Sequence, residues 1–213
     1  MSNQPFDVII IGGGIAGVSL GALLSSKVRT AVVEMEATPG YHATGRSAAY
    51  FAPAYGNDVI RALTRASADT YETADLFAYP VIRRRSALFV GTETQSESIA
   101  VMHAEQPDLQ RLNAADLKNQ VPIFHDQMSH GLLDESGGDL DVDAILQGYL
   151  KLLRHNGGEI VTDAKVQTLT YKGTWQISTN KNTFTAPIIV NAAGAWADNL
   201  AAMAGLKPIG LTP

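Results

Sequence analysis

A glycine-rich turn near the start of the chain has the residue types and spacing of a phosphate-binding site. Gly12, Gly14 and Gly17 follow the apolar run 8–11 and lead into an apolar stretch typical of a helix. The first glycine permits a tight strand-to-helix turn, the second lets a pyrophosphate approach bare backbone, and the third lets the helix lie close to the strand. The free N–H groups and the positive end of the helix dipole would then bind phosphate.

An acidic residue ends the next expected strand. Residues 30–33 form a second short apolar run, typical of a strand buried in a parallel sheet, and Glu34 follows it. A carboxylate at this place can accept both hydroxyls of an adenosine ribose, and it would repel a 2′-phosphate. Strand, glycines, helix, second strand and acid thus occur in the order of a dinucleotide-binding site. The alternative is a glycine-rich turn in an ordinary α/β domain.

A second loop could supply another anionic contact. Thr44 or Gly45 could cap a short helix that begins at Arg46. An arginine at such a helix start suits a second phosphate. A solvated arginine on a surface loop is the alternative.

Composition excludes several classes of protein. The chain has 213 residues, 46% of them apolar, and its net charge of −5 argues against a nucleic-acid partner. It has no cysteine, which excludes disulfides and fits a reducing compartment. The apolar run at 8–11 is too short for a signal or membrane segment, so we expect a cytoplasmic protein. His125 and His130 lack a third ligand at metal spacing, so no metal site is expected.

The remaining patterns predict a second block of mixed structure inserted into the first. A helix over 57–75 has apolar residues from Val59 to Ala74 spaced for one buried face. The basic run Arg83–Arg85 is expected to be solvated. The further predicted elements are strands 81–82, 87–90, 131–133, 159–162 and 188–194, a meander of strands 166–171, 175–179 and 183–187, and helices 97–105, 114–118 and 142–155.

Taken together, these stretches resemble the FAD-dependent D-amino-acid oxidase and glycine oxidase superfamily. The glycine fingerprint, Glu34, the expected meander and the strand 188–194 carry the likeness. Within the superfamily, residues 39–49 (Pro-Gly-Tyr-His-Ala-Thr-Gly-Arg-Ser-Ala-Ala), 147–150 and 190–196 are most similar to the bacterial D-arginine dehydrogenases. The similarity covers essentially the whole chain, and the 41–49 stretch is far more specific than the glycine motif.

The resemblance implies the fold and its division. We expect an α/β protein with a Rossmann-like FAD-binding domain of the glutathione-reductase type, a parallel sheet plus a three-stranded meander. Residues 1–78 and 142–206 would form this domain. Residues 79–141 and 207–213 would form part of an inserted, incomplete α+β substrate domain.

The resemblance also implies FAD as the cofactor and assigns roles to single positions. Ile15 and Ala16 would contact the pyrophosphate, Met35 would lie beside the ribose or adenine, and Val166 would offer its backbone to the adenine. Tyr50 and Tyr55 would line the substrate pocket. The expected cofactor-binding residues are Gly12, Gly14, Ile15, Ala16, Gly17, Glu34, Met35, His42, Ala43, Thr44, Gly45, Arg46, Ser47, Ala48, Ala49, Val166, Ala193, Gly194 and Trp196.

Three positions bear on how far the resemblance extends. Some relatives attach FAD covalently where this chain has His42, and a packing histidine is the alternative. The arginine-specific relatives carry a histidine at the place of Tyr50 and an acidic residue near the place of Ala87. Since a desolvated guanidinium needs a paired carboxylate, we expect a pocket for uncharged side chains.

The implied activity is oxidation of the CH–NH group of an amino acid or amine, most simply a D-amino acid, by hydride transfer to the flavin. A 2-hydroxy-acid or glycerol-phosphate dehydrogenase and a nucleotide-binding fragment without activity are the alternatives. Members of the family are nearly twice as long, and their later half supplies the arginine that binds the substrate carboxylate. We therefore expect no turnover from residues 1–213 alone, and an exposed apolar surface that favours a homodimer.

Overall fold

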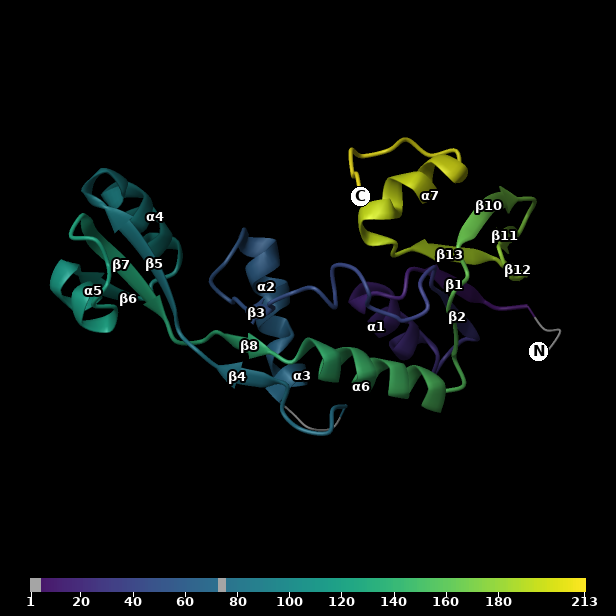
Figure 1. The fold of residues 1–213 in the computed structure, drawn as a ribbon, viewed down its shortest axis with the longest axis horizontal. Coiled ribbons are helices and arrows are strands. Elements are labelled where there is room, and N and C mark those ends of the chain that lie inside the picture. Colours follow the sequence, from purple (N-terminus) through teal and green to yellow (C-terminus); the bar gives the residue numbers. More distant parts are fainter. Residues whose placement is uncertain (1–4, 73–75) are drawn as a thin grey trace. The chain divides into compact units, whose positions relative to one another are not determined.

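The computed structural model describes residues 5–72 and 76–213 and shows two compact units. The first contains residues 1–47, 75–78 and 142–213, and the second contains residues 48–74 and 79–141. Figure 1 labels most of the elements of both units.

A four-stranded parallel sheet forms the centre of the first unit (Figure 1). Its order is β13 (Ile188–Asn191), β1 (Val8–Ile11), β2 (Thr30–Val33) and β9 (Glu159–Val161). Every residue of β1 and β2 is buried. Such strands must be covered on both faces, as their unbroken apolar runs predict.

The two faces of this sheet have different covers. Val8, Ile10 and Val32 pack with residues of the helices α1 (Ile15–Leu24) and α6 (Val142–His155). Because side chains alternate along a strand, Ile9 and Ile11 point to the other face. There they join a core with the antiparallel meander of β10 (Val166–Tyr171), β11 (Trp175–Thr179) and β12 (Thr183–Ala186), and with Leu200 of α7 (Ala197–Met203).

Residues 207–213 belong to the first unit by their contacts, whereas the family resemblance predicted that they form part of the substrate domain. The carboxylate of Asp198 explains the difference, because it accepts backbone hydrogen bonds from Ile209 (3.0 Å), Gly210 (2.7 Å) and Leu211 (2.6 Å). Asp198 is itself buried. It therefore ties this segment to α7.

The second unit contains two small antiparallel sheets. The first has the order β3 (Tyr50–Phe51), β8 (Gly138–Leu140) and β4 (Ile82–Arg84). The pairing of β3 with β8 groups residues 48–74 with this unit, whereas the sequence analysis placed them with the FAD-binding domain. The sequence patterns predicted only part of β4, as a strand over residues 81–82. They did not predict β3 or β8.

The second sheet has the order β5 (Ala87–Thr92), β7 (Met128–Asp134) and β6 (Gln110–Asn113). The 3-10 helix η1 (Glu93–Gln95) leads into α4 (Ser96–Glu105), and α4 and α5 (Ala114–Gln120) pack on the strands. Leu132 points to a core with Leu109 and Ala54, and its neighbour Leu133 points to a core with Leu112 and Leu117.

The helix expected over 57–75 differs from the prediction in two ways. It consists of α2 (Asp58–Ala66) and α3 (Ala68–Glu72), and the expected end at 73–75 lies outside the described residues. Its predicted buried face is instead exposed, with Val59 at 65%, Ile60 at 47% and Leu63 at 63% of their full accessibility. The buried residue of α2 is Arg61.

The short helix predicted from Arg46 is absent. Residues 41–46 form successive turns, in which Gly45 N–H donates to the Gly40 carbonyl at 2.6 Å and Arg46 N–H donates to the His42 carbonyl at 3.1 Å. The chain then leads to β3 without a helical turn. Within the described part of the chain, no helix has the length and apolar character needed to cross a membrane.

Candidate functional site

The glycine turn joins β1 to α1 with the backbone freedom that the motif predicts. Gly12 has φ of +119°, and a Cβ there would collide with the Ala192 carbonyl oxygen. A Cβ on Gly17 would collide with the Gly12 carbonyl oxygen. These two glycines therefore let α1 begin close to β1 and β13. The first N–H groups of a helix have no acceptor within it and point toward this turn.

Glu34 lies directly after β2 and closes one side of the turn. It is 8% exposed. Its Oε2 accepts a hydrogen bond from Gly13 N–H at 2.6 Å, and its Oε1 accepts one from Glu36 N–H at 2.8 Å. A carboxylate has about four acceptor positions, so both oxygens keep capacity for ligand hydroxyls.

The loop after Glu34 returns to the glycine turn and closes its other side. Gly40 N–H donates to the Gly13 carbonyl at 2.9 Å. The Thr44 hydroxyl accepts the Ile15 N–H at 3.0 Å, and so caps α1 from a distant part of the sequence. Thr44 or Gly45 was expected to cap a short helix beginning at Arg46. In the structure Thr44 caps α1 instead.

His42 and Trp196 come together beside this loop. His42 Nε2 lies 2.8 Å from Glu36 Oε1, and the two rings have centroids 4.4 Å apart. The ring of His42 is thus held by a carboxylate and an indole. These contacts describe a packed histidine, and Glu36 is a partner that the sequence patterns did not single out.

The other expected cofactor residues of the first unit lie on the returning loop, on the first turn of α1, after β13 and at the start of β10. Arg46 is exposed, with its guanidinium 5.0 Å from the centre of the Tyr41 ring. Val166 starts β10 and belongs to the core. Ala193 and Gly194 follow β13, and a Cβ on Gly194 would meet no atom within 4 Å. Ala16 is exposed on the first turn of α1, and Met35, Ala43 and Ser47 lie along the returning loop.

The structure therefore brings together most of the predicted residues of the first unit. Tightly packed backbone at Gly12 and Gly17, a capped helix start and a buried carboxylate form a cradle that fits a dinucleotide. Ala48, Ala49, Tyr50 and Tyr55 belong to the second unit.

Tyr50 is held firmly within the second unit. Its hydroxyl donates to the Arg85 carbonyl at 2.6 Å, and the Arg85 guanidinium lies 4.8 Å from the centre of its ring. Burial raises the pKa of the Tyr50 phenol, and the negative charge of Asp134 raises it further. The phenol is therefore uncharged, and its proton is donated to the Arg85 carbonyl, so Tyr50 does not act as a base.

Tyr55, in contrast to Tyr50, is largely exposed. It follows β3 in a turn closed by its N–H to the Ala52 carbonyl at 3.1 Å, and its side chain is 68% exposed. Its phenol is accessible to a ligand, whereas the hydroxyl of Tyr50 already has an acceptor.

The basic run of the second unit has acidic partners. Arg85 contacts Asp139 through Nε at 2.9 Å and through a terminal nitrogen at 2.6 Å, which holds the pKa of Asp139 below its usual value. Arg84 forms an ion pair with Glu72. All three arginines of the run are exposed, which agrees with the solvated face expected from the sequence.

The second unit also contains a cavity of about 450 Å³. Asp134, which is 3% exposed, contributes to its wall, together with Phe51 and Pro53 of the Tyr55 loop. Asp134 Oδ1 accepts hydrogen bonds from the Ser136 N–H at 2.8 Å and the Ser136 hydroxyl at 2.5 Å. No group of three acidic or histidine side chains at metal-binding distance occurs among residues 5–72 and 76–213.

Known proteins with similar sequences include enzymes of two substrate types. The chain is 26% identical over 230 residues to L-2-hydroxyglutarate dehydrogenase of Escherichia coli K12, covering 95% of this chain and 51% of that protein. It is 22% identical over 208 residues to monomeric sarcosine oxidase of an Arthrobacter species, covering 93% of this chain and 54% of that protein. The chain thus spans about half the length of these relatives.

Among solved structures, glycine oxidase from Geobacillus kaustophilus has a similar fold. The TM-score is 0.82 at 19% identity, and the match covers 96% of this chain and 60% of that chain. This likeness confirms the predicted fold class. The sequence model of the FAD dependent oxidoreductase (DAO) family matches residues 7–213. The chain therefore belongs to the FAD dependent oxidoreductase family, and its cofactor is FAD.

Proposed function

We propose that the protein, in its full natural length, oxidises the CH–NH group of an amino acid or a related amine. The observation that carries this proposal is the hydrogen bond from Ile15 N–H to the Thr44 hydroxyl. It joins the phosphate-binding helix to the 39–49 loop, the stretch most similar to amino-acid dehydrogenases. The similarity to a sarcosine oxidase also supports an amine substrate.

The first unit would hold the cofactor. Ile15 and Ala16 at the start of α1 would contact the pyrophosphate, which the Ala16 N–H would bind because the Ile15 N–H already donates to the Thr44 hydroxyl, and Glu34 would bind the adenosine ribose. The loop from His42 to Ser47 would pass along the pyrophosphate toward the flavin. The bound FAD would supply the acceptor for the hydride that leaves the substrate carbon.

The second unit would orient the substrate. The exposed phenol of Tyr55 is the better candidate for direct contact, because the Tyr50 hydroxyl is already bonded to the Arg85 carbonyl. Tyr50 would then form a fixed, neutral wall. Holding the Cα–H against an acceptor in one orientation supplies much of the rate enhancement in such reactions.

Oxidation of a 2-hydroxy acid is the second candidate. The similarity to L-2-hydroxyglutarate dehydrogenase supports it, and that relative has a slightly higher identity than the sarcosine oxidase. Both reactions remove a hydride from a carbon that bears a heteroatom, so the nucleotide cradle does not separate them. Only the identity of the substrate that is oxidised distinguishes the two reactions.

Dye reduction by the protein expressed from its complete reading frame tests the proposal. The panel contains glycine, sarcosine and D-amino acids in one arm, and 2-hydroxy acids and glycerol phosphate in the other. We expect turnover with the amine arm. Turnover confined to the hydroxy arm would replace the proposed function with its rival, and saturable binding of NAD without FAD would overturn both.

The side-chain preference concerns Ala87 of β5. Ala87 lies directly opposite Asp134 on β7, and side chains opposite one another share a face of the sheet. Because Ala87 stands in place of an acidic residue, we propose that uncharged D-amino acids such as D-alanine and D-methionine react faster than D-arginine. A strong preference for D-arginine would contradict this and would implicate Asp134.

Self-association is a further part of the proposal. Val59, Ile60 and Leu63 are exposed apolar side chains that lie close together on α2 in the second unit. Light scattering during gel filtration would detect a homodimer. The cysteine-free sequence leaves the cytoplasm as the proposed location, to be tested by cell fractionation.

A further inference from the structure

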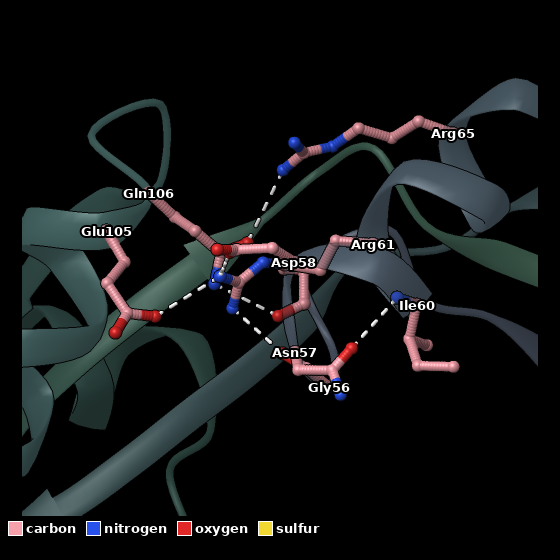
Figure 2. Close-up of polar contacts among 9 residues, drawn as sticks. Gly56, Asn57, Asp58, Ile60, Arg61, Arg65, Glu105 and Gln106 are labelled. Carbon is pink, nitrogen blue, oxygen red and sulfur yellow. Dashed lines mark hydrogen bonds and ion pairs between the residues drawn. The ribbon is translucent and has the colours of Figure 1, made fainter.

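Arg61 is a charged residue that lies on the buried side of a surface helix. It is 8% exposed. Its guanidinium donates to the Gly56 carbonyl at 2.8 Å, pairs with Asp58, and reaches Glu105 Oε2 at the end of α4 at 3.2 Å (Figure 2). A buried guanidinium with three acceptors is satisfied, so it can remain charged there.

Gln106 makes a second contact from the same place. It follows α4 and is 5% exposed. Its Nε2 donates to the Ala54 carbonyl at 3.0 Å. The carbonyls of Ala54 and Gly56 are therefore both bonded to buried side chains, and these carbonyls stand on either side of Tyr55.

The contacts fix the backbone of Tyr55 and leave its side chain free. Buried polar bonds to a turn limit its backbone motion, because breaking them leaves desolvated groups without partners. Tyr55 nevertheless remains 68% exposed. Since α4 packs on β5 and β7, Arg61 and Gln106 attach the turn to the larger sheet of the second unit.

The orientation of α2 buries Arg61 and leaves apolar side chains of the helix exposed. Stability alone favours burying Val59 and Leu63 and leaving an arginine in water. In this helix Arg61 is buried and the two apolar side chains are exposed. In α2, a buried cation beside the Ala54–Gly56 turn therefore takes the place of buried apolar side chains. Such a departure from the usual pattern is expected where a function requires a segment to be held in one position.

We propose that Arg61 and Gln106 are positioning residues that fix the Ala54–Gly56 turn and thereby present the phenol of Tyr55 to the substrate. The substrate part of this inference rests on the proposed function, in which Tyr55 contacts the reacting molecule. The fixed turn itself depends only on the contacts within the second unit.

A fluorine label tests the turn without any turnover. In FAD-saturated protein with 3-fluorotyrosine at position 55, Arg61→Met and Gln106→Leu should each move the ¹⁹F resonance toward the value of the free amino acid and narrow it. A label at Tyr171, in the meander, should not move. Arg65→Met is the matched control, since Arg65 is exposed one turn further along α2 and reaches Gln106 only at 3.5 Å.

An unchanged resonance at position 55 in folded Arg61→Met and Gln106→Leu protein would overturn the inference. Arg61→Lys keeps the charge but cannot contact three acceptors in the planar arrangement of a guanidinium, so it should shift the resonance by an intermediate amount. If Arg61→Met fails to fold, the ¹⁹F resonances of Gln106→Leu and Arg61→Lys test the same inference.

Kinetics of the protein from its complete reading frame test the substrate part. Arg61→Met should raise KM about tenfold and change kcat less than about twofold. In a Tyr55→Ala background the same substitution should raise KM less than about twofold, because it acts through Tyr55. An undiminished effect in that background would contradict the inference. If the unaltered protein oxidises neither amines nor hydroxy acids, the proposed function fails, and the fluorine result still decides whether the turn is fixed.

Discussion

The two units use apolar residues in opposite ways. In the first unit, the apolar runs 8–11 and 30–33 are buried on both faces of a parallel sheet. In the second, the apolar stripe of α2 is exposed and Arg61 is buried. An apolar pattern therefore predicts burial well where both sides of an element are covered. It fails where a buried polar network decides which side of a helix faces inward.

The largest expected effect concerns turnover by residues 1–213 alone. We predict that residues 1–213, saturated with FAD, do not reduce a dye with any of a panel of D-amino acids. The substrate carboxylate needs a desolvated cation, but Arg84 and Arg85 are exposed and paired with acids, and the buried Arg61 is already paired with Asp58 and Glu105. A rate of about 1 per second or faster, ordinary for an enzyme, would show that the second unit suffices.

Removing the backbone freedom at Gly12 should disable the first unit. Gly12→Ala introduces a Cβ that collides with the Ala192 carbonyl at a φ of +119°. We expect a loss of at least about 3 kcal/mol in the free energy of unfolding. FAD affinity should fall more than about a hundredfold.

Gly173→Ala is the matched control for that substitution. Gly173 also has a positive φ, of +79°, but its Cβ would meet no atom within 4 Å. It should cost about 1 kcal/mol of backbone strain and leave FAD binding unchanged. Equal effects in the two variants, measured by urea unfolding and FAD titration, would show that strain alone matters at Gly12.

Glu34 should contribute a smaller amount to the same site. Loss of a charged hydrogen bond costs about 1.5–3 kcal/mol, so Glu34→Ala should weaken FAD binding by about ten- to a hundredfold. Glu34→Gln keeps one carbonyl oxygen for Gly13 or Glu36 and should weaken it less. Unchanged affinity in Glu34→Ala, measured by fluorescence titration, would remove Glu34 from the ribose site.

The smallest expected effect is a pH dependence confined to the 209–211 segment. Backbone N–H donors, first that of Ile209, hold the pKa of Asp198 below its usual 3.8. The contribution of Asp198 to stability is therefore complete at pH values above 3.8 and is lost as the pH falls through its lowered pKa. The amide NMR shifts of Gly210 and Leu211 should report this titration.

Two results would contradict that assignment. One is a midpoint at or above 3.8 for both amides. The other is an unchanged titration in Asp198→Asn, which keeps the shape of the side chain and removes its charge.

The sequence predicted the first unit well because local signals there agree with tertiary structure. Val8–Ile11 is short and apolar and is followed by glycines, which is the pattern of a buried strand that ends in a tight turn. The contact of Thr44 with Ile15 could not be predicted in the same way. It joins residues far apart in the chain, and the local pattern around Thr44 equally favours a cap for the next helix.

In the second unit the local signals were incomplete. Tyr50–Phe51 and Gly138–Leu140 are too short to show strand periodicity, and they form strands through pairing with residues far away in the sequence: β3 with β8, and β8 also with β4. The spacing of Val59 and Leu63 correctly indicated a helix but not its rotation. Glu105 and Gln106, which set that rotation through Arg61 and the Ala54 carbonyl, lie more than forty residues further along the chain.

The rotation of α2 also bears on how this segment changes during evolution. Replacing Val59, Ile60 or Leu63 with a polar residue removes little buried area, so the stability of the second unit exerts weak selection on them. Drift would then make this face polar, while Arg61 is retained together with Glu105. If orthologues keep these three positions apolar, that retention must come from a requirement other than the folding of this unit.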